Sequence, residues 1–88
     1  MNVSYKYLGS TGDNQVVQGS GRGFLYGILI GNAGTTLEIS DSATDGDGNL
    51  IAKLTTPGTG YYPLNVRYTN GITCDVTNAA DVTILYGP

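Results

Sequence analysis

Apolar and polar residues alternate one by one along much of this chain. Between positions 36 and 40, and again between 72 and 77, apolar side chains stand at every second position with Thr, Ser or acidic residues between them. A period of two predicts β-strands with one buried and one exposed face. Similar short runs recur between Gly, Asn, Asp and Pro residues. They predict eight strands, at 3–8, 14–19, 23–31, 36–41, 49–55, 61–68, 72–77 and 81–86.

The fold class follows from this spacing. No window of eleven residues has apolar side chains at helical spacing, so we expect no helix. Residues 1–88 are expected to form one all-β domain, a compact antiparallel β-sandwich or a barrel. A chain this short buries only about 60–68% of its unfolded surface. Because Cys74 is the single cysteine, no disulfide within the chain can add stability, which raises the expectation of a homo-oligomer.

The alternation also predicts which side chains face the core. Leu37 and Ile39 should point inward from their strand. Cys74 alternates with Ile72 and Val76, so we interpret it as a small inward-facing hydrophobe and not as a reactive thiol.

The turn at Asn70-Gly71 allows a prediction of register. We expect the flanking strands to pair as a hairpin, in which a two-residue loop would place Arg67 opposite Cys74 and mix core with surface. A three-residue loop, with Gly71 at a positive φ, keeps one apolar face. This second register, which we predict, pairs Tyr68 with Ile72, Val66 with Cys74, and Leu64 with Val76.

Two strands have apolar side chains on both faces. In the strand 23–31, one face should carry Phe24, Tyr26, Ile28 and Ile30, and the other should carry Leu25 and Leu29 with Gly27 and Gly31 beside them. In the last strand, Leu85 lies on the face opposite to Val82, Ile84 and Tyr86. One interpretation is a sheet edge covered by a loop. The other is contact with a further subunit, with the glycines allowing close approach. The candidate interface residues are Leu25, Leu29, Leu85 and one of Tyr61 and Tyr62, which must point to opposite faces.

Charge excludes several classes of partner. The net charge is −3, and the four basic residues, Lys6, Arg22, Lys53 and Arg67, are scattered. This argues against nucleic-acid binding and against an anionic membrane surface. The longest apolar stretch, 24–30, is too short to cross a bilayer. The first residues lack the pattern of a secretory signal, so we expect synthesis in the cytoplasm without export by that route.

Catalytic chemistry is not expected. With no histidine, a nucleophile would need Lys6, Lys53 or a carboxylate as its base, and no known signature surrounds them. The glycine-rich segment 19–23 leads into a β pattern and not into the helix that holds a phosphate. The usual zinc ligands are also lacking. We therefore expect no enzyme and no cofactor, and a hydrolase is the remotest alternative.

One acidic segment has the spacing of a calcium loop. Asp45, Asp47 and Asn49 form D-x-D-x-N, like the first ligands of such loops. However, Leu50 stands where glycine is expected, and Thr56 where the bidentate glutamate is expected. An ordinary exposed turn explains the same residues, because Asp and Asn stabilise turns with their own side chains.

Three segments carry a resemblance. The run 24–32, FLYGILIGN, the run 35–41, TTLEISD, and the ending 81–86, DVTILY, are similar to short bacteriophage virion proteins. The likeness covers about 22–86. It implies a jelly-roll-like or sandwich module that decorates or cements the outer capsid, often as a homotrimer, with the major capsid protein as its partner.

The sequence therefore leads to two functional hypotheses. The first is a capsid decoration or cement protein on the outer surface of the virion, made in the host cytoplasm. The alternative is a carbohydrate- or receptor-binding module of a phage tail or fibre. In that case exposed tyrosines, with Tyr5, Tyr7 and the pair Tyr61 and Tyr62 as candidates, would stack on sugar rings.

Overall fold

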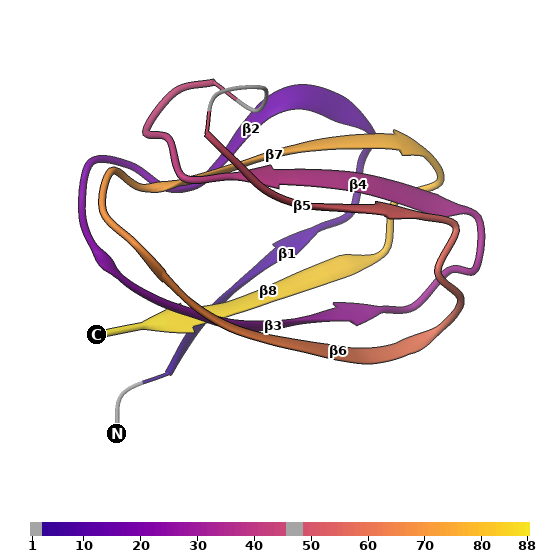
Figure 1. The fold of residues 1–88 in the computed structure, drawn as a ribbon. Helices are drawn as coiled ribbons and strands as arrows, with labels where there is room; N and C mark the ends of the chain where they lie inside the picture. Colours follow the sequence, from indigo (N-terminus) through magenta and orange to yellow (C-terminus); the bar gives the residue numbers. More distant parts are fainter. Residues whose placement is uncertain (1–2, 46–48) are drawn as a thin grey trace.

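The chain folds into two packed β-sheets (Figure 1). A computed structural model describes residues 3–45 and 49–88. Its eight strands are β1 (Ser4–Leu8), β2 (Gly12–Gln18), β3 (Gly23–Ile30), β4 (Thr35–Ser40), β5 (Leu50–Thr55), β6 (Gly60–Tyr68), β7 (Ile72–Asn78) and β8 (Val82–Gly87). Each begins and ends within two residues of the range expected from the sequence. The described residues contain no helix that could span a membrane.

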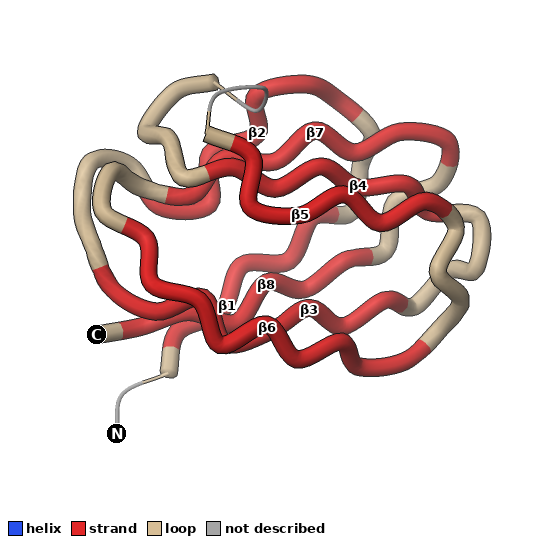
Figure 2. The backbone as a smooth tube through the Cα atoms, viewed as in Figure 1, coloured by secondary structure: helices blue, strands red, loops and turns tan. Residues whose placement is uncertain are grey.

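Strand pairing in the sandwich is nested. Sheet 1 has the order β1-β8-β3-β6 and sheet 2 the order β2-β7-β4-β5, and all neighbours are antiparallel. The first strand thus pairs with the eighth, the second with the seventh, the third with the sixth and the fourth with the fifth. Figure 2 shows the two layers with their connections at the ends. The all-β antiparallel sandwich is confirmed, and its arrangement is jelly-roll-like.

The core fills the space between the two sheets. Leu37, Ile39 and Cys74 are at most 1% exposed, which confirms their predicted inward orientation. Tyr68 is also buried, and its hydroxyl donates a hydrogen bond to Oε1 of Gln18. The buried apolar set is Leu8, Val17, Leu25, Ile28, Ile30, Leu37, Ile39, Tyr68, Ile72, Cys74, Val76, Val82 and Ile84.

The orientation predicted for the first half of β3 is wrong. Leu25 pairs with Tyr86 of β8, but the next pair joins Gly27 to Leu85, so Tyr26 is an extra residue in β3. Such a bulge reverses the alternation on either side of it. Leu25 therefore faces the core with 0% exposure, while Leu29 faces out with 42% exposure. Leu25 cannot contact another subunit.

The predicted hairpin between residues 68 and 72 does not form. The structure places β6 in sheet 1 and β7 in sheet 2, so neither loop length that we weighed applies. The turn crosses between the sheets and is bound to the end of β4: the Asp41 carboxylate accepts hydrogen bonds from the backbone N–H groups of Thr69 and Asn70. Gly71 does have a positive φ, 139°, as expected for this position.

The bulge in β3 predicts unequal effects of two identical substitutions. Leu25→Ala should lower the free energy of unfolding by about 2–5 kcal/mol, because it leaves a cavity in the core. Leu29→Ala, in the same strand but 42% exposed, should cost about 1 kcal/mol or less. Urea unfolding followed by tyrosine fluorescence measures both. Equal losses would contradict the orientation that the bulge gives β3.

Candidate functional site

The outer face of sheet 1 carries two rows of aligned side chains. In one row Tyr5 lies opposite Leu85, which lies beside Gly27 and then Pro63. In the next row the order is Tyr7, Thr83, Leu29 and Tyr61. We refer to Tyr5, Tyr7, Leu29, Tyr61 and Leu85 as the tyrosine face. It spans all four strands of the sheet.

The tyrosine side chains of this face are largely exposed to solvent. Tyr5 is 71% exposed, Tyr7 55% and Tyr61 48%. Both β3 and β8 are central strands of sheet 1, so the interpretation as a sheet edge covered by a loop is wrong. Within the described residues the large exposed apolar side chains are Val3, Tyr5, Tyr7, Val16, Leu29, Leu50 and Tyr61, and most of them belong to this side of the sandwich.

The pair Tyr61 and Tyr62 is divided between the two faces of β6, as expected. Tyr62 packs against the core, and its hydroxyl donates to the carbonyl oxygens of Pro57 at 2.5 Å and Gly58 at 2.9 Å. The Tyr61 ring lies over Gly27, where a β-carbon would collide with it, and its hydroxyl donates to the carbonyl of Tyr26 at 3.3 Å. Tyr61 is therefore the member of the pair on the tyrosine face.

The glycines of β3 serve contacts within the chain. The space beside Gly27 is taken by the Tyr61 ring, and the space beside Gly31 by the Asp81 carboxylate. The expectation that these two glycines leave room for another subunit is therefore wrong. Asp81 also lies near the Tyr7 hydroxyl, and its negative charge is the main cause that raises the pKa of this phenol above its ordinary value.

One end of the tyrosine face is extended by a stacked group. The Arg67 guanidinium lies 4.6 Å from the centre of the Phe24 ring, and the rings of Phe24 and Tyr26 stack with 6.3 Å between centres. The Tyr26 hydroxyl donates to the carbonyl of Pro88 at 2.9 Å. The bulge in β3 makes this group, since it removes Phe24 and Tyr26 from the core side. The alternation of apolar and polar residues in the sequence does not predict this stacked group.

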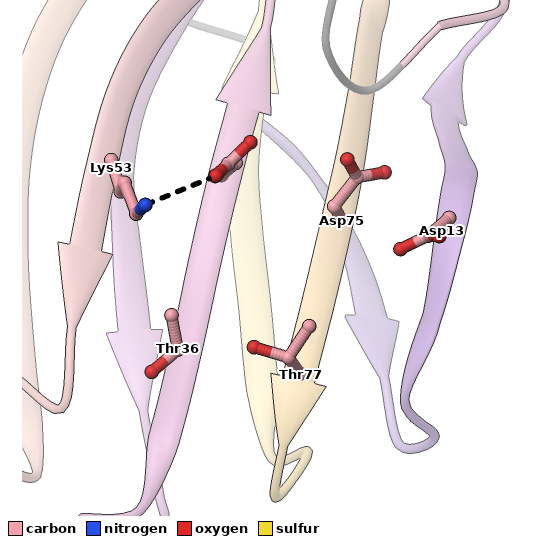
Figure 3. Close-up of a pocket in the computed structure, with 6 residues that line it drawn as sticks. Asp13, Thr36, Lys53, Asp75 and Thr77 are labelled. Atoms are coloured by element: carbon pink, nitrogen blue, oxygen red, sulfur yellow. Dashed lines mark ion pairs between the residues drawn. The ribbon is translucent and has the colours of Figure 1, made fainter.

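The outer face of sheet 2 is polar and hollowed (Figure 3). The hollow holds about 280 Å³, and its lining consists of Asp13, Thr36, Glu38, Lys53, Asp75 and Thr77. Nζ of Lys53 lies 3.4 Å from Oε1 of Glu38, and the Asp75 carboxylate accepts a hydrogen bond from the backbone N–H of Asn14 at 2.7 Å. The two faces of the sandwich thus differ sharply in chemistry.

Three of the charged groups of the hollow have partners within the fold. Its ion pair and the bond from Asn14 give structural partners to Lys53, Glu38 and Asp75. Within residues 3–45 and 49–88, no group of three or more His, Cys, Asp or Glu side chains is placed to hold a metal ion. Burial, with a smaller effect of Asp75, raises the pKa of the Cys74 thiol from 9.0 to about 12, which disfavours the reactive thiolate.

Only two of the three candidate calcium ligands lie within the described residues. Asp47 lies outside the described residues. Asp45 and Asn49 are exposed at the ends of the same loop, where the backbone N–H of Asp45 donates to the Ser42 hydroxyl at 3.0 Å. The carbonyl of Asn49 accepts a hydrogen bond from the N–H of Asp41 at 2.8 Å. Neither of these bonds joins two carboxylates of the described residues.

Comparison with known proteins found no match to this chain among protein-family models, curated proteins or solved structures. A functional role of the tyrosine face is therefore argued from its geometry.

The raised pKa of Cys74 predicts a loss of stability in alkali. The folded chain keeps the thiol protonated up to about pH 12, whereas the unfolded chain loses that proton near pH 9. The free energy of unfolding should be unaffected by this group below pH 9 and should fall above it, by up to about 1.4 kcal/mol per pH unit. Comparison with Cys74→Ala isolates this effect from the ionisation of tyrosines. Parallel curves for the two proteins between pH 9 and 11 would refute it.

Proposed function

We propose that this chain is a non-catalytic structural protein that docks on other protein surfaces through the tyrosine face. Its setting, in this proposal, is the outer surface of a bacteriophage capsid, where it acts as a decoration or cement protein. The single observation that carries the docking role is the exposure of Tyr5, Tyr7, Leu29 and Tyr61 together on one sheet face.

The physical reason for docking is the exposure of a contiguous apolar surface to water. Single exposed apolar residues are normal, but a contiguous apolar patch with a polar surround marks a contact surface. Tyrosine and arginine are enriched at the energetic centres of protein interfaces, because they combine large apolar area with a polar group. The tyrosine face offers both, with Arg67 over Phe24 at its end. The polar face of sheet 2 is the natural side to remain in solvent.

The capsid setting is supported by the resemblance of residues 22–86 to small virion proteins and by the jelly-roll-like sandwich. The net charge of −3 is consistent with an external position, since an acidic protein is not drawn to packaged DNA. Its action there would be mechanical. Burial of the tyrosine face against neighbouring subunits would oppose their separation.

In this proposal the molecules act as homotrimers and bind the major capsid protein. Leu29, Leu85 and Tyr61 contribute the apolar contact, together with Tyr5 and Tyr7. A stable interface buries about 800 Å² on each partner. The four strands are each about 4.8 Å from the next, so the tyrosine face is about 14 Å across and supplies the centre of such a contact and not all of it.

A matched pair of charge insertions tests the proposal. Leu29 on the tyrosine face is 42% exposed, and Val16 on the outer side of sheet 2 is 45% exposed. Leu29→Glu should convert a trimer, about three times the 9.2 kDa chain mass, to a monomer and abolish co-sedimentation with capsids of the virus that encodes it. Val16→Glu should change neither. Light scattering gives the mass and centrifugation the binding.

A wild-type protein that is monomeric and does not co-sediment with those capsids would refute the decoration role. Equal effects of the two charge insertions would refute the docking role of the tyrosine face, because the insertions differ in place and not in kind.

The second candidate function is carbohydrate binding, as in a tail or fibre module. It is favoured by Tyr5 and Tyr7, whose rings are the most exposed aromatic groups of the described residues and lie side by side along β1. Such rings can stack on the apolar face of a sugar.

A glycan array tests this alternative. If it holds, a defined class of glycan should bind reproducibly, Tyr5→Ala should weaken binding about tenfold or more, and Tyr5→Phe should retain it because the stacking ring remains. An array without reproducible binding would leave protein docking as the better explanation of the exposed tyrosines.

A further inference from the structure

The four edge strands of the sandwich are not equally protected against an added strand. An edge strand presents unpaired backbone N–H and C=O groups along its outer side, and proteins normally interrupt that row with bulges, proline or charge. The edges here are β1 and β6 in sheet 1 and β2 and β5 in sheet 2.

Three of these edges are interrupted. β6 contains Pro63 and has Asn65 at a φ of 54°, which breaks its ladder with β3. β2 has two register shifts and Asn14 at a φ of 55°. β5 has a register shift between Leu50 and Ala52. An extended chain could not pair along the full length of any of them, although β5 keeps a regular stretch from Ala52 to Thr55.

β1 has no such interruption of its backbone, and its protection is limited to its short length and the charge of Lys6. Its five residues pair with β8 one by one, from Ser4 opposite Tyr86 to Leu8 opposite Val82, without a register shift or a positive φ. Four of the five, Ser4 to Tyr7, are exposed. The regular stretch is about 17 Å long, enough for the hydrogen bonds of one added strand.

We propose that β1 binds an extended segment of another protein, which joins sheet 1 as a fifth strand. The backbone of a β-strand is the ligand that such an open ladder recognises, and side chains at alternate positions supply specificity. This binding site goes beyond the tyrosine face, since it is the edge of the sheet and not its surface, and it does not depend on the phage setting.

The charge on β1 defines the chemistry of the partner. Lys6 lies on the same side of the strand as the buried Leu8 but is itself exposed. Antiparallel pairing of β1 with β1 of a second copy, in full overlap, would place Lys6 opposite Lys6. Like charges directly opposite each other destabilise a strand pair. Full pairing of two copies is thus disfavoured, and the better partner strand belongs to a different protein and carries Asp or Glu opposite Lys6, with apolar side chains opposite Tyr5 and Tyr7.

The test uses a displayed library of random nine-residue peptides and the intact protein. Selected peptides should be β-rich and should share one acidic position. Lys6→Glu should weaken the binding of these peptides about fivefold or more, and selection on this variant should yield Lys or Arg at the same position. Arg22→Glu, which changes the net charge equally in the exposed loop before β3, should bind as the wild type does.

Amide hydrogen exchange locates the bound peptide. Backbone amides of β1 that exchange rapidly in the free protein should become protected, while those of β6, β2 and β5 keep their rates. Failure to select any peptide that distinguishes wild type from Lys6→Glu would overturn the proposal. So would protection at another edge, or selected peptides that lose affinity for Leu29→Glu and not for Lys6→Glu, because they would occupy the tyrosine face.

Discussion

The molecule depends on one packed apolar layer between two sheets, and a single extra residue in β3 decides which side chains enter it. The bulge at Tyr26 turns Leu25 into the core and leaves Leu29 outside, although both belong to one strand. It also releases Phe24 and Tyr26 from the core side. If Tyr26 were a regular strand residue and not a bulge, β3 would turn Phe24 and Tyr26 toward the core and expose Leu25, and the surface that we propose for docking would lose its stacked end.

The two outer faces of the sandwich divide its roles. Sheet 2 covers the core with Thr and charged side chains, and two of its carboxylates, Glu38 and Asp75, have partners within the fold. Such a face is adapted to water. Sheet 1 covers the same core from the other side with tyrosine and leucine. Part of that face has contacts within the chain, since the Tyr61 ring covers Gly27. Tyr5 and Leu29 remain open to water, and the docking that we propose would bury them.

The alternation of apolar and polar residues predicted the positions of the strands correctly, but it did not predict which strands pair with each other. Alternation placed all eight strands and oriented Leu37, Ile39 and Cys74 correctly, because it depends on which face of a strand meets water. It failed for the hairpin at 68–72, since two strands that face each other across a core bury the same alternate residues as two strands paired in one sheet. The deciding contact, Asp41 with the turn at Thr69, joins residues 28 positions apart and leaves no local pattern. A bulge is similarly invisible, because Tyr26 is as compatible with a regular strand as with an extra residue.

The nested pairing of the strands also has a kinetic consequence. Because β1 pairs with β8, residues near the two ends of the chain, such as Ser4 and Tyr86, must meet before sheet 1 is complete. Local contacts are few in such a topology, and chains dominated by distant contacts fold in milliseconds to seconds and not in microseconds. The pair β4 and β5 is separated by the shortest loop of any ladder, so zipping is expected to start there and to move outward. During synthesis β1 cannot pair until β8 has left the ribosome, and until then the β3 edge, which β8 covers in the native sheet, stays open to other chains.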